Sequence, residues 1–278
     1  MNFFKLISAS MYALAGFVPL AGAETVGHWR FEEEAYLEDS SGNNHTLAVG
    51  VDGEGPVRVS QYALPESGPG SAFPKTIQGS ANRSAAKGVG PDNGFRRSPF
   101  AVEIPRDGER LTRQLTIEAF INLSFSANLS SSVIAGQGVL ASEGAGWGLI
   151  ITSQNSPVGA QKLVFQFNKK GGPWNEGLAM VDSGVVIDLH KDYYVAVSAD
   201  FSDPSPEGIT LYVKNLTDNE EMRALGFPHH AGYTRIAATE APLIIGGGAG
   251  AVLPFYGVID EVRLSDEKLP REKLLMTQ

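Results

Sequence analysis

The sequence predicts an all-β protein built as a sandwich of two packed antiparallel sheets. Short segments that alternate between apolar and polar residues recur along the chain, and glycine, proline, asparagine or aspartate bounds most of them. The 278 residues include 32 glycines and 16 prolines, and convincing helical periodicity appears only near the C-terminus. Many short strands separated by turn residues are typical of a β-sandwich, and a chain of this length suits one large β domain.

The expected strands carry β-branched or aromatic residues in most cases. They are expected at residues 26–32, 46–51, 57–60, 99–104, 115–122, 132–136, 146–152, 162–168, 177–181, 192–200, 209–215, 242–246 and 255–264. Residues 66–98 are rich in glycine, serine, proline and alanine and contain few large apolar residues. We expect this segment to be a long surface loop, either a poorly ordered insertion or a rim over one face of the sandwich.

The first 23 residues are typical of a secretory signal peptide. Lys5 is the only charged residue before Glu24, and the apolar run over residues 6–20 is too short and broken to span a bilayer comfortably. The small residues at 21–23 (AGA) match a cleavage site, which disfavours the alternative of an uncleaved anchor. We therefore expect a secreted, extracellular or periplasmic protein whose single domain covers residues 24–278.

The mature chain is acidic and contains no cysteine. Removal of Lys5 with the signal peptide takes the formal charge from −9 to −10. An acidic chain without basic clusters argues against nucleic acid or an anionic membrane as a partner. The missing cysteines exclude a disulfide framework, a thiolate metal site and a cysteine nucleophile.

The two ends of the mature chain carry its most specific motifs. Residues 26–32 (VGHWRFE) alternate as a strand and are followed by the turn sequence DSSGNNH at 39–45. Near the other end, residues 255–264 form a strand with Asp260 and Glu261 at its middle, and adjacent strand residues are expected to face opposite sides. A short helix should follow, capped by Ser265 or Asp266.

These motifs resemble the opening W-x-F-D/E and D-S-S-G-N sequences and the closing strand–helix signature of bacterial laminin-G-like domains. Residues 115–121 (LTIEAFI) are similar to the F-T-I-E-A-W-I strand of that family, and residues 147–149 and 194–198 fall where it has inner strands. The resemblance covers residues 24–278 and implies a concanavalin A-like jelly-roll sandwich of two antiparallel sheets with a short C-terminal helix. It says less about function, because this fold hosts lectins, adhesins, glucanases and lyases.

The resemblance also implies a structural calcium ion, which many members of the family hold. The N-terminal and C-terminal strands commonly pair in this fold, which would bring the 39–44 turn close to the last strand. Calcium takes six to eight oxygen ligands, and the candidate ligands are Glu32, Asp39, Asn44 and Asp260. The alternative is an ordinary Asx-type turn, with Asp260 paired to an arginine.

A ligand-binding surface is expected in the loop at residues 169–176 (KKGGPWNE). Sugar recognition needs exposed aromatic faces together with planar polar groups. Trp174 lies among turn residues, and Asn175 and Lys170 can form hydrogen bonds with hydroxyl groups. The alternative for Trp174 is a loop anchor packed on the edge of the sandwich. Residues 227–233 (FPHHAGY) are a second candidate loop.

No catalytic motif appears in the sequence. The strand E-x-D-x-x-E of concanavalin A-like glucanases is absent, and so are the arginine-rich and Q-x-H strands of alginate-lyase-like relatives. No G-x-S-x-G elbow of a serine hydrolase occurs. The run Glu32-Glu33-Glu34 alternates in direction and suits a solvated strand end.

We therefore expect a secreted carbohydrate- or glycoconjugate-binding module, with a polysaccharide or glycosylated surface as partner and calcium as a structural cofactor. One alternative is a glycoside hydrolase or polysaccharide lyase with a non-standard site, which needs two carboxylates facing each other across a cleft. Another is a protein–protein adhesion module, which an exposed apolar patch would favour.

Overall fold

The structure of the chain is a computed structural model that describes residues 25–49, 57–60, 71–88, 94–95, 99–104, 111–138, 146–169, 177–228, 234–248 and 253–277. Within these ranges eight strands form sheet A: β1 (Thr25–Trp29), β3 (Val57–Ser60), β6 (Ser84–Lys87), β8 (Gln114–Leu123), β13 (Asp192–Asp200), β14 (Ile209–Asn215), β15 (Arg223–Phe227) and β17 (Gly257–Ser265). Seven described strands form sheet B: β2 (Ala48–Val49), β7 (Phe100–Val102), β9 (Ser132–Gln137), β10 (Trp147–Ile151), β11 (Lys162–Asn168), β12 (Leu178–Val186) and β16 (Leu243–Ile245).

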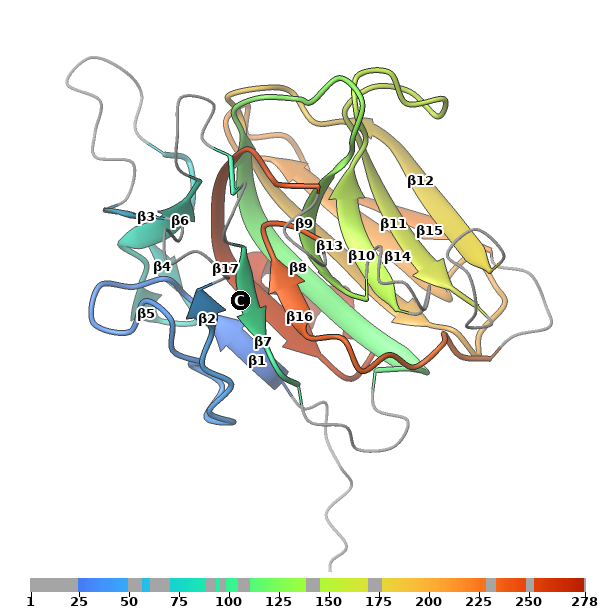
Figure 1. Cartoon of the computed structure of the whole chain (residues 1–278), viewed down its shortest axis with the longest axis horizontal. Helices are drawn as coiled ribbons and strands as arrows, with labels where there is room; N and C mark the ends of the chain where they lie inside the picture. The colour runs from blue at the N-terminus through green and yellow to red at the C-terminus, as the bar shows by residue number, and fades with distance from the viewer. Residues whose placement is uncertain are drawn as a thin grey trace, which may run out of the picture.

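The two sheets confirm the predicted antiparallel sandwich. Sheet A has the order β15-β14-β13-β8-β17-β6-β3, with β1 also paired to β17, and sheet B has the order β12-β11-β10-β9-β16-β7-β2. Pairings between the described strands are antiparallel throughout both sheets. Figure 1 shows sheet B as the nearer layer, with sheet A behind it.

The hydrophobic core lies between the sheets, because alternate residues of the long strands face it. In β8, Leu115, Ile117 and Ile121 belong to this core, and in β11 Phe165 and Phe167 do. The residues between them face outward and meet other parts of the chain. Each sheet therefore has an outer face, and these two faces carry the features that bear on function.

The first and last strands pair with each other, as the sequence predicts. Thr25 of β1 lies opposite Ser265 of β17, and Trp29 lies opposite Val262. On its other side β17 pairs with β8 over most of its length. The last strand of the chain therefore lies in the interior of sheet A.

The expectation that Asp260 and Glu261 face opposite sides of the sheet is wrong. The register between β17 and β8 shifts between Asp260 and Arg263, and Glu261 has a positive φ of 50°. Ile259 and Val262 both belong to the core, so the two residues between them lie on the outer side. A β-bulge of this kind places an extra residue in one strand and breaks its alternation.

Residues 66–98 are not one long loop, which corrects the sequence-based expectation. Within the described part, β4 (Thr76–Ile77) pairs with β5 (Ser80–Ala81), and β6 joins sheet A between β17 and β3. Phe73 packs against Phe120 on the outer face of sheet A, with 5.7 Å between ring centroids. The carboxylate of Asp192 also holds this segment, since its Oδ2 accepts a hydrogen bond of 2.6 Å from the backbone nitrogen of Ala72.

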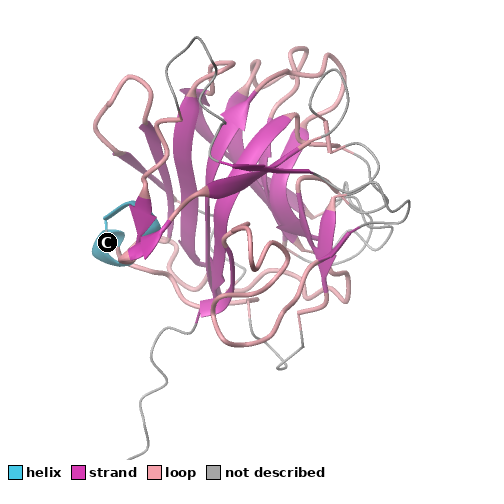
Figure 2. Cartoon of the chain, turned by 90° about the vertical axis from the view of Figure 1, so that its left-hand side faces the viewer, coloured by secondary structure: helices cyan, strands magenta, loops and turns pink. Residues whose placement is uncertain are grey.

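The C-terminal segment forms two 3₁₀ turns instead of the expected single helix. They are η2 (Arg271–Lys273) and η3 (Leu275–Thr277), and Ser265, a proposed cap, is the last residue of β17. Pro270 precedes η2 and provides no side-chain cap. Leu269, Leu274 and Leu275 pack on the outer face of sheet A, so tertiary contacts rather than helix propensity hold this tail. Figure 2 shows the turns outside the strands at the C-terminus.

The tail is also held through its backbone. Thr116 Oγ1 of β8 donates to the carbonyl oxygen of Glu267 and accepts from the backbone nitrogen of Leu269. Ser198 Oγ of β13 donates to the carbonyl oxygen of Leu269 at 2.8 Å. No helix in the described ranges has the length and apolar character needed to cross a membrane.

Candidate ligand-binding site

Asp39, one of the predicted calcium ligands, organises the turn that follows β1. Its Oδ1 accepts hydrogen bonds from the backbone nitrogens of His28 (2.9 Å) and Ser41 (2.8 Å). Its Oδ2 accepts from Ser41 Oγ (2.8 Å) and from the backbone nitrogen of His45 (3.1 Å). Each oxygen therefore has two protein donors, which is the Asx-type arrangement that the sequence left as the alternative.

Asp260, a second predicted ligand, lies buried at the bulge of β17 and is 1% exposed. Its Oδ1 accepts from the backbone nitrogen of Glu261 (2.9 Å), and its Oδ2 accepts from Asn82 Nδ2 (3.0 Å). Burial, followed by the negative charge of Glu261, raises the pKa of Asp260 well above its usual value. Arg30 pairs with Glu261 at 2.8 Å (Nη2 to Oε1), and His28 Nε2 lies 2.6 Å from Glu261 Oε2.

The remaining predicted ligands do not complete a cage with these two carboxylates. Glu32 Oε1 accepts a hydrogen bond of 2.7 Å from the backbone nitrogen of Arg83, and Asn44 is exposed with a φ of 61°. Within the described ranges, no group of three or more histidine, aspartate or glutamate residues has the geometry to hold a metal ion. Protein donors engage the oxygens of Asp39 and Asp260, and the calcium site stays a prediction.

The predicted glycan loop joins two neighbouring strands of sheet B. It follows β11 and precedes β12, and the backbone nitrogen of Lys169 donates to the carbonyl oxygen of Gly177 at 3.0 Å. Lys170, Trp174 and Asn175 lie outside the described residues, so their role as ligand-binding residues stays a prediction. Most of the second candidate loop, residues 229–233, also lies outside them.

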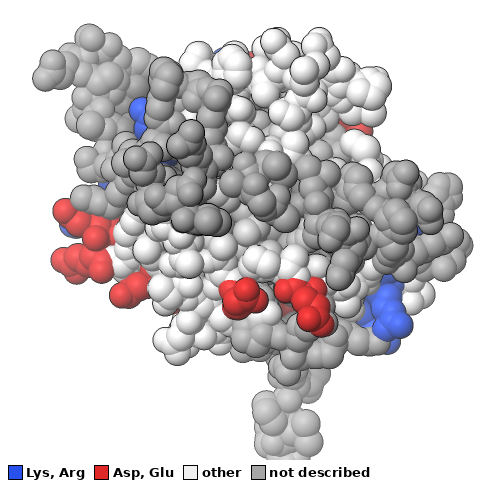
Figure 3. Space-filling view, in the orientation of Figure 1, with Lys and Arg blue, Asp and Glu red and all other residues white. Residues whose placement is uncertain are grey.

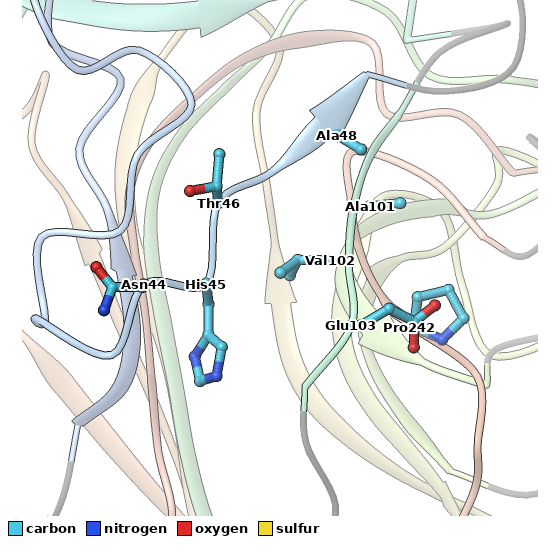
Figure 4. Close-up of a pocket in the computed structure, with 8 residues that line it drawn as sticks. All are labelled: Asn44, His45, Thr46, Ala48, Ala101, Val102, Glu103 and Pro242. Atoms are coloured by element: carbon cyan, nitrogen blue, oxygen red, sulfur yellow. The ribbon is translucent and has the colours of Figure 1, made fainter.

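A pocket of about 340 Å³ lies on the outer face of sheet B, beside its β2–β7 edge. Phe100 and Val102 belong to the core, so Ala101 between them faces outward, and Glu103 directly after β7 lies on the same side. The loop before β2 forms the other wall, and Figure 4 shows His45 and Glu103 on opposite sides of the pocket. The lining residues are Asn44, His45, Thr46, Ala48, Ala101, Val102, Glu103 and Pro242.

The imidazole of His45 is fixed in this wall. Its Nδ1 lies 2.7 Å from the carbonyl oxygen of Val26 and 3.7 Å from Asp39 Oδ2. Both of these oxygens are acceptors, so Nδ1 carries the proton between them. The carbonyl oxygen of His45 also accepts from Trp29 Nε1 at 2.8 Å, which ties the loop to the core.

The pocket is rich in acceptors above an apolar floor. Glu103 supplies a carboxylate, the His45 ring supplies Nε2, and the Asn44 amide and Thr46 hydroxyl add adaptable polar groups. None of the eight lining residues is a lysine or arginine. Such a lining favours an uncharged or cationic ligand with many hydrogen-bond donors, such as a polyol. It disfavours an anion. Its volume lies within the range of small-molecule sites.

Sequence reasoning found one side of this pocket only. Asn44 and the 39–45 motif were recognised, but as parts of a metal site, and His45 was not assigned a role. Glu103 lies within the expected strand 99–104 and gave no functional signal, because its position opposite His45 depends on the pairing of β2 with β7. Linear spacing does not reveal which strands become neighbours.

Comparison with known proteins informs the fold. No protein-family model matches the sequence, and no curated protein matches it. Among solved structures, the chain is similar to domain 4 of AbnA, a GH43 extracellular arabinanase from Geobacillus stearothermophilus, in complex with arabinotriose. The identity is 14% and the TM-score 0.51, over 89% of this chain and 95% of that one.

Binding domains of two toxins share the same fold. The binding domain of botulinum neurotoxin DC in complex with SialylT has 11% identity and a TM-score of 0.52, covering 89% of this chain and 49% of that one. The binding domain of Paraclostridial Mosquitocidal Protein 1 has 14% identity and a TM-score of 0.51, covering 91% and 51%. This chain therefore spans about half the length of those two domains, and the similarity shows a shared β-sandwich.

Proposed function

We propose that this protein is a carbohydrate-binding module whose ligand contacts the pocket between His45 and Glu103. The observation that carries the proposal is the lining of that pocket, in which fixed acceptors stand over an apolar floor. Sugars present hydroxyl donors around a ring with apolar C–H faces, so they match both parts of the lining. The eight lining residues include a single carboxylate, which suits recognition better than a two-carboxylate hydrolysis.

The fold supports the same proposal at the level of analogy. The similar domain of AbnA was solved with arabinotriose, and the neurotoxin binding domain with SialylT. Because fold alone does not define function, these complexes raise the expectation of a glycan ligand without placing it on this chain. The proposal for this protein therefore depends on its own pocket.

Three further parts of the proposal come from the sequence. Residues 1–23 act as a cleaved signal peptide, so the module works outside the cytoplasm. Trp174, with Asn175 and Lys170, provides a second contact surface on the loop between β11 and β12. The resemblance to laminin-G-like domains favours a structural calcium ion, whereas the hydrogen-bonded Asp39 favours a calcium-independent turn.

A binding screen with the full mature chain tests the proposal. Affinity electrophoresis against arabinan, β-glucan, galactomannan, chitosan and alginate should show retardation by at least one neutral or cationic polysaccharide and none by alginate. Glu103→Gln should weaken that binding at least tenfold, as calorimetry with the retained polysaccharide measures. Glu220→Gln, the same change at an exposed turn on the opposite sheet, should leave it unchanged.

Other results of the screen would change the proposal. Absence of retardation by every polysaccharide would contradict a glycan-binding role. Equal affinity for the wild type and Glu103→Gln would move the site away from the pocket, and Trp174→Ala would then test the loop. New reducing ends in the retained polysaccharide would support the glycoside hydrolase alternative.

A further inference from the structure

The pocket between His45 and Glu103 opens where the pairing of β2 with β7 ends. The last pair on this side is Ala48 with Ala101. Residues 44–46 precede β2 and Glu103 follows β7, and Figure 4 shows these two stretches of chain separating around the pocket. The volume of about 340 Å³ lies at the lower end of the range for small-molecule sites, so it suits one sugar unit of a longer glycan.

The carboxylate of Glu103 is available to a ligand. Val102 pairs with Leu243, which places Pro242 beside Glu103 on the neighbouring strand, and both residues line the pocket. Glu103 is exposed, and the ion pairs between described residues do not include it. A cation that enters the pocket therefore meets a carboxylate that no described basic side chain engages.

The charge around the pocket also favours a cation. The chain carries a formal charge of −9, and the eight described lining residues include no lysine or arginine. Figure 3 shows acidic side chains at the left and along the lower part of the face that carries the pocket, with basic ones at the lower right. A surface of one sign raises the local concentration of ligands of the opposite sign.

The apolar floor of the pocket has no aromatic ring. It consists of Ala48, Ala101, Val102 and Pro242, and none of the eight described lining residues is a phenylalanine, tyrosine or tryptophan. Quaternary ammonium groups are recognised by aromatic cages, so this lining disfavours them. A neutral sugar would gain only uncharged hydrogen bonds here. A primary ammonium group would gain a charge-assisted bond to Glu103, and such bonds are roughly twice as strong.

The other side of the pocket suits hydroxyl groups. His45 is held by its Nδ1, which lies 2.7 Å from the carbonyl oxygen of Val26, and its Nε2 remains for a ligand. The Asn44 amide and the Thr46 hydroxyl can each donate and accept. Figure 4 shows these groups across the pocket from Glu103. A ring with an amine on one side and hydroxyls on the other matches both walls.

We propose that the pocket binds an amino sugar unit with a free primary amine, whose ammonium group donates to the carboxylate of Glu103. The hydroxyls of the same ring bond with His45, Asn44 and Thr46. This inference rests on the proposed function and names the class of glycan, one with unacetylated amino sugars. Glu103 is then the residue that distinguishes the free amine from its acetylated form, because an amide has no positive charge.

Two matched oligosaccharides test this inference on the full mature chain. The probes are the β-1,4-linked tetrasaccharide of glucosamine and the same tetrasaccharide of N-acetylglucosamine. Calorimetry at about pH 6 keeps the carboxylate ionised and the amine largely protonated. We expect the wild type to bind the free-amine probe at least tenfold more tightly than the acetylated one. Glu103→Gln should reduce this preference to less than twofold.

Two control variants separate the pocket from the overall charge of the protein. Glu220→Gln makes the same change in net charge at an exposed turn on the opposite sheet, and should keep the full preference. Thr46→Val removes a hydroxyl from the exposed wall of the pocket, and should weaken both probes by a similar factor because they share the ring hydroxyls.

A third probe asks whether the sugar ring is recognised together with its amine. Nα-acetyl-lysine methylamide offers a primary ammonium group without a sugar. It should bind the wild type at least tenfold more weakly than the free-amine tetrasaccharide. Equal affinity would show that the pocket recognises an ammonium group on any carrier, such as a lysine side chain, and would overturn the amino sugar as ligand.

The remaining outcomes distinguish this inference from the proposed function. Equal wild-type affinities for the two tetrasaccharides would overturn the amino-sugar preference and leave a glycan site in the pocket. A preference that persists in Glu103→Gln, or that Glu220→Gln loses equally, would assign it to the overall charge and overturn the role of Glu103. A wild type that binds no glycan would overturn both.

Discussion

Glu118 of β8 and Arg263 of β17 form an ion pair beneath the C-terminal tail, with 2.5 Å between Oε1 and Nη2 and side chains that are 0% and 5% exposed. The second oxygen of Glu118 accepts hydrogen bonds from the Tyr194 hydroxyl (2.6 Å) and the backbone nitrogen of Leu275 (2.8 Å). Arg263 Nη2 also donates to the carbonyl oxygen of Lys273 at 2.6 Å. Burial and the charge of Glu118 raise the pKa of Tyr194, which therefore stays protonated.

Removal of Arg263 should destabilise the protein strongly. Arg263→Met leaves the buried Glu118 carboxylate without its counter-charge, and the loss of one partner of a buried pair typically costs about 3–5 kcal/mol. Urea unfolding measures this loss. Lys162→Met, which breaks a partly exposed pair with Asp182, should cost less than about 1 kcal/mol. Similar losses in the two variants would show that the tail does not enclose the Glu118–Arg263 pair.

The tail should contribute to stability through its leucines. Leu274 is fully buried in the cluster on the outer face of sheet A. Leu274→Ala should therefore lower the free energy of unfolding by about 2–5 kcal/mol. Met276→Ala, in the same turn region but only partly buried, should lower it less. The reverse order, measured by urea unfolding, would argue against the packed position of the tail.

Asp260 should make the protein less stable as pH rises. Its pKa is raised in the folded protein, so the folded chain holds a proton that the unfolded chain releases above about pH 4. The associated stability is present below that pH and is lost as pH rises through the folded-state pKa. Asp260→Asn removes this titration. Urea unfolding from pH 4 to pH 8 should show the variant gaining stability relative to the wild type, and a constant difference would contradict the shift.

Asp39 should stabilise its turn without a metal ion. Asp39→Asn replaces one acceptor oxygen by an NH₂ group that faces Ser41 Oγ and the backbone nitrogen of His45. Leaving such donors unsatisfied costs about 1–3 kcal/mol. We expect the same decrease in melting temperature in calcium and in EGTA. A wild-type melting temperature that rises with calcium, and no longer does so in Asp39→Asn, would support the predicted calcium site instead.

The sequence predicted the sandwich because its long strands can be recognised from their own residues. Residues 115–122 and 192–200 combine β-branched and aromatic residues with clear alternation, and they form β8 and β13. The strand β6 was missed because its sequence, SAAK, has the small residues of a loop. Its place in sheet A comes from pairing with β17 and β3, which are distant in sequence.

The candidate site was predictable in part for a similar reason. The turn at 39–45 was found from its motif, yet the direction of the Asp39 oxygens depends on backbone donors that only the folded turn brings together. The bulge at Glu261 could not be read from an alternation rule, because a bulge is a departure from that rule.

The pairing of β1 with β17 has a consequence for the order in which the protein can fold during synthesis. In the described part of the chain β17 is the one strand that β1 pairs with, and β17 also separates β8 from β6. Sheet A therefore stays divided until residues 257–265 have left the ribosome. The two parts of sheet A that β17 joins, β8 with β13–β15 and β6 with β3, can therefore meet only after nearly the whole chain has been made.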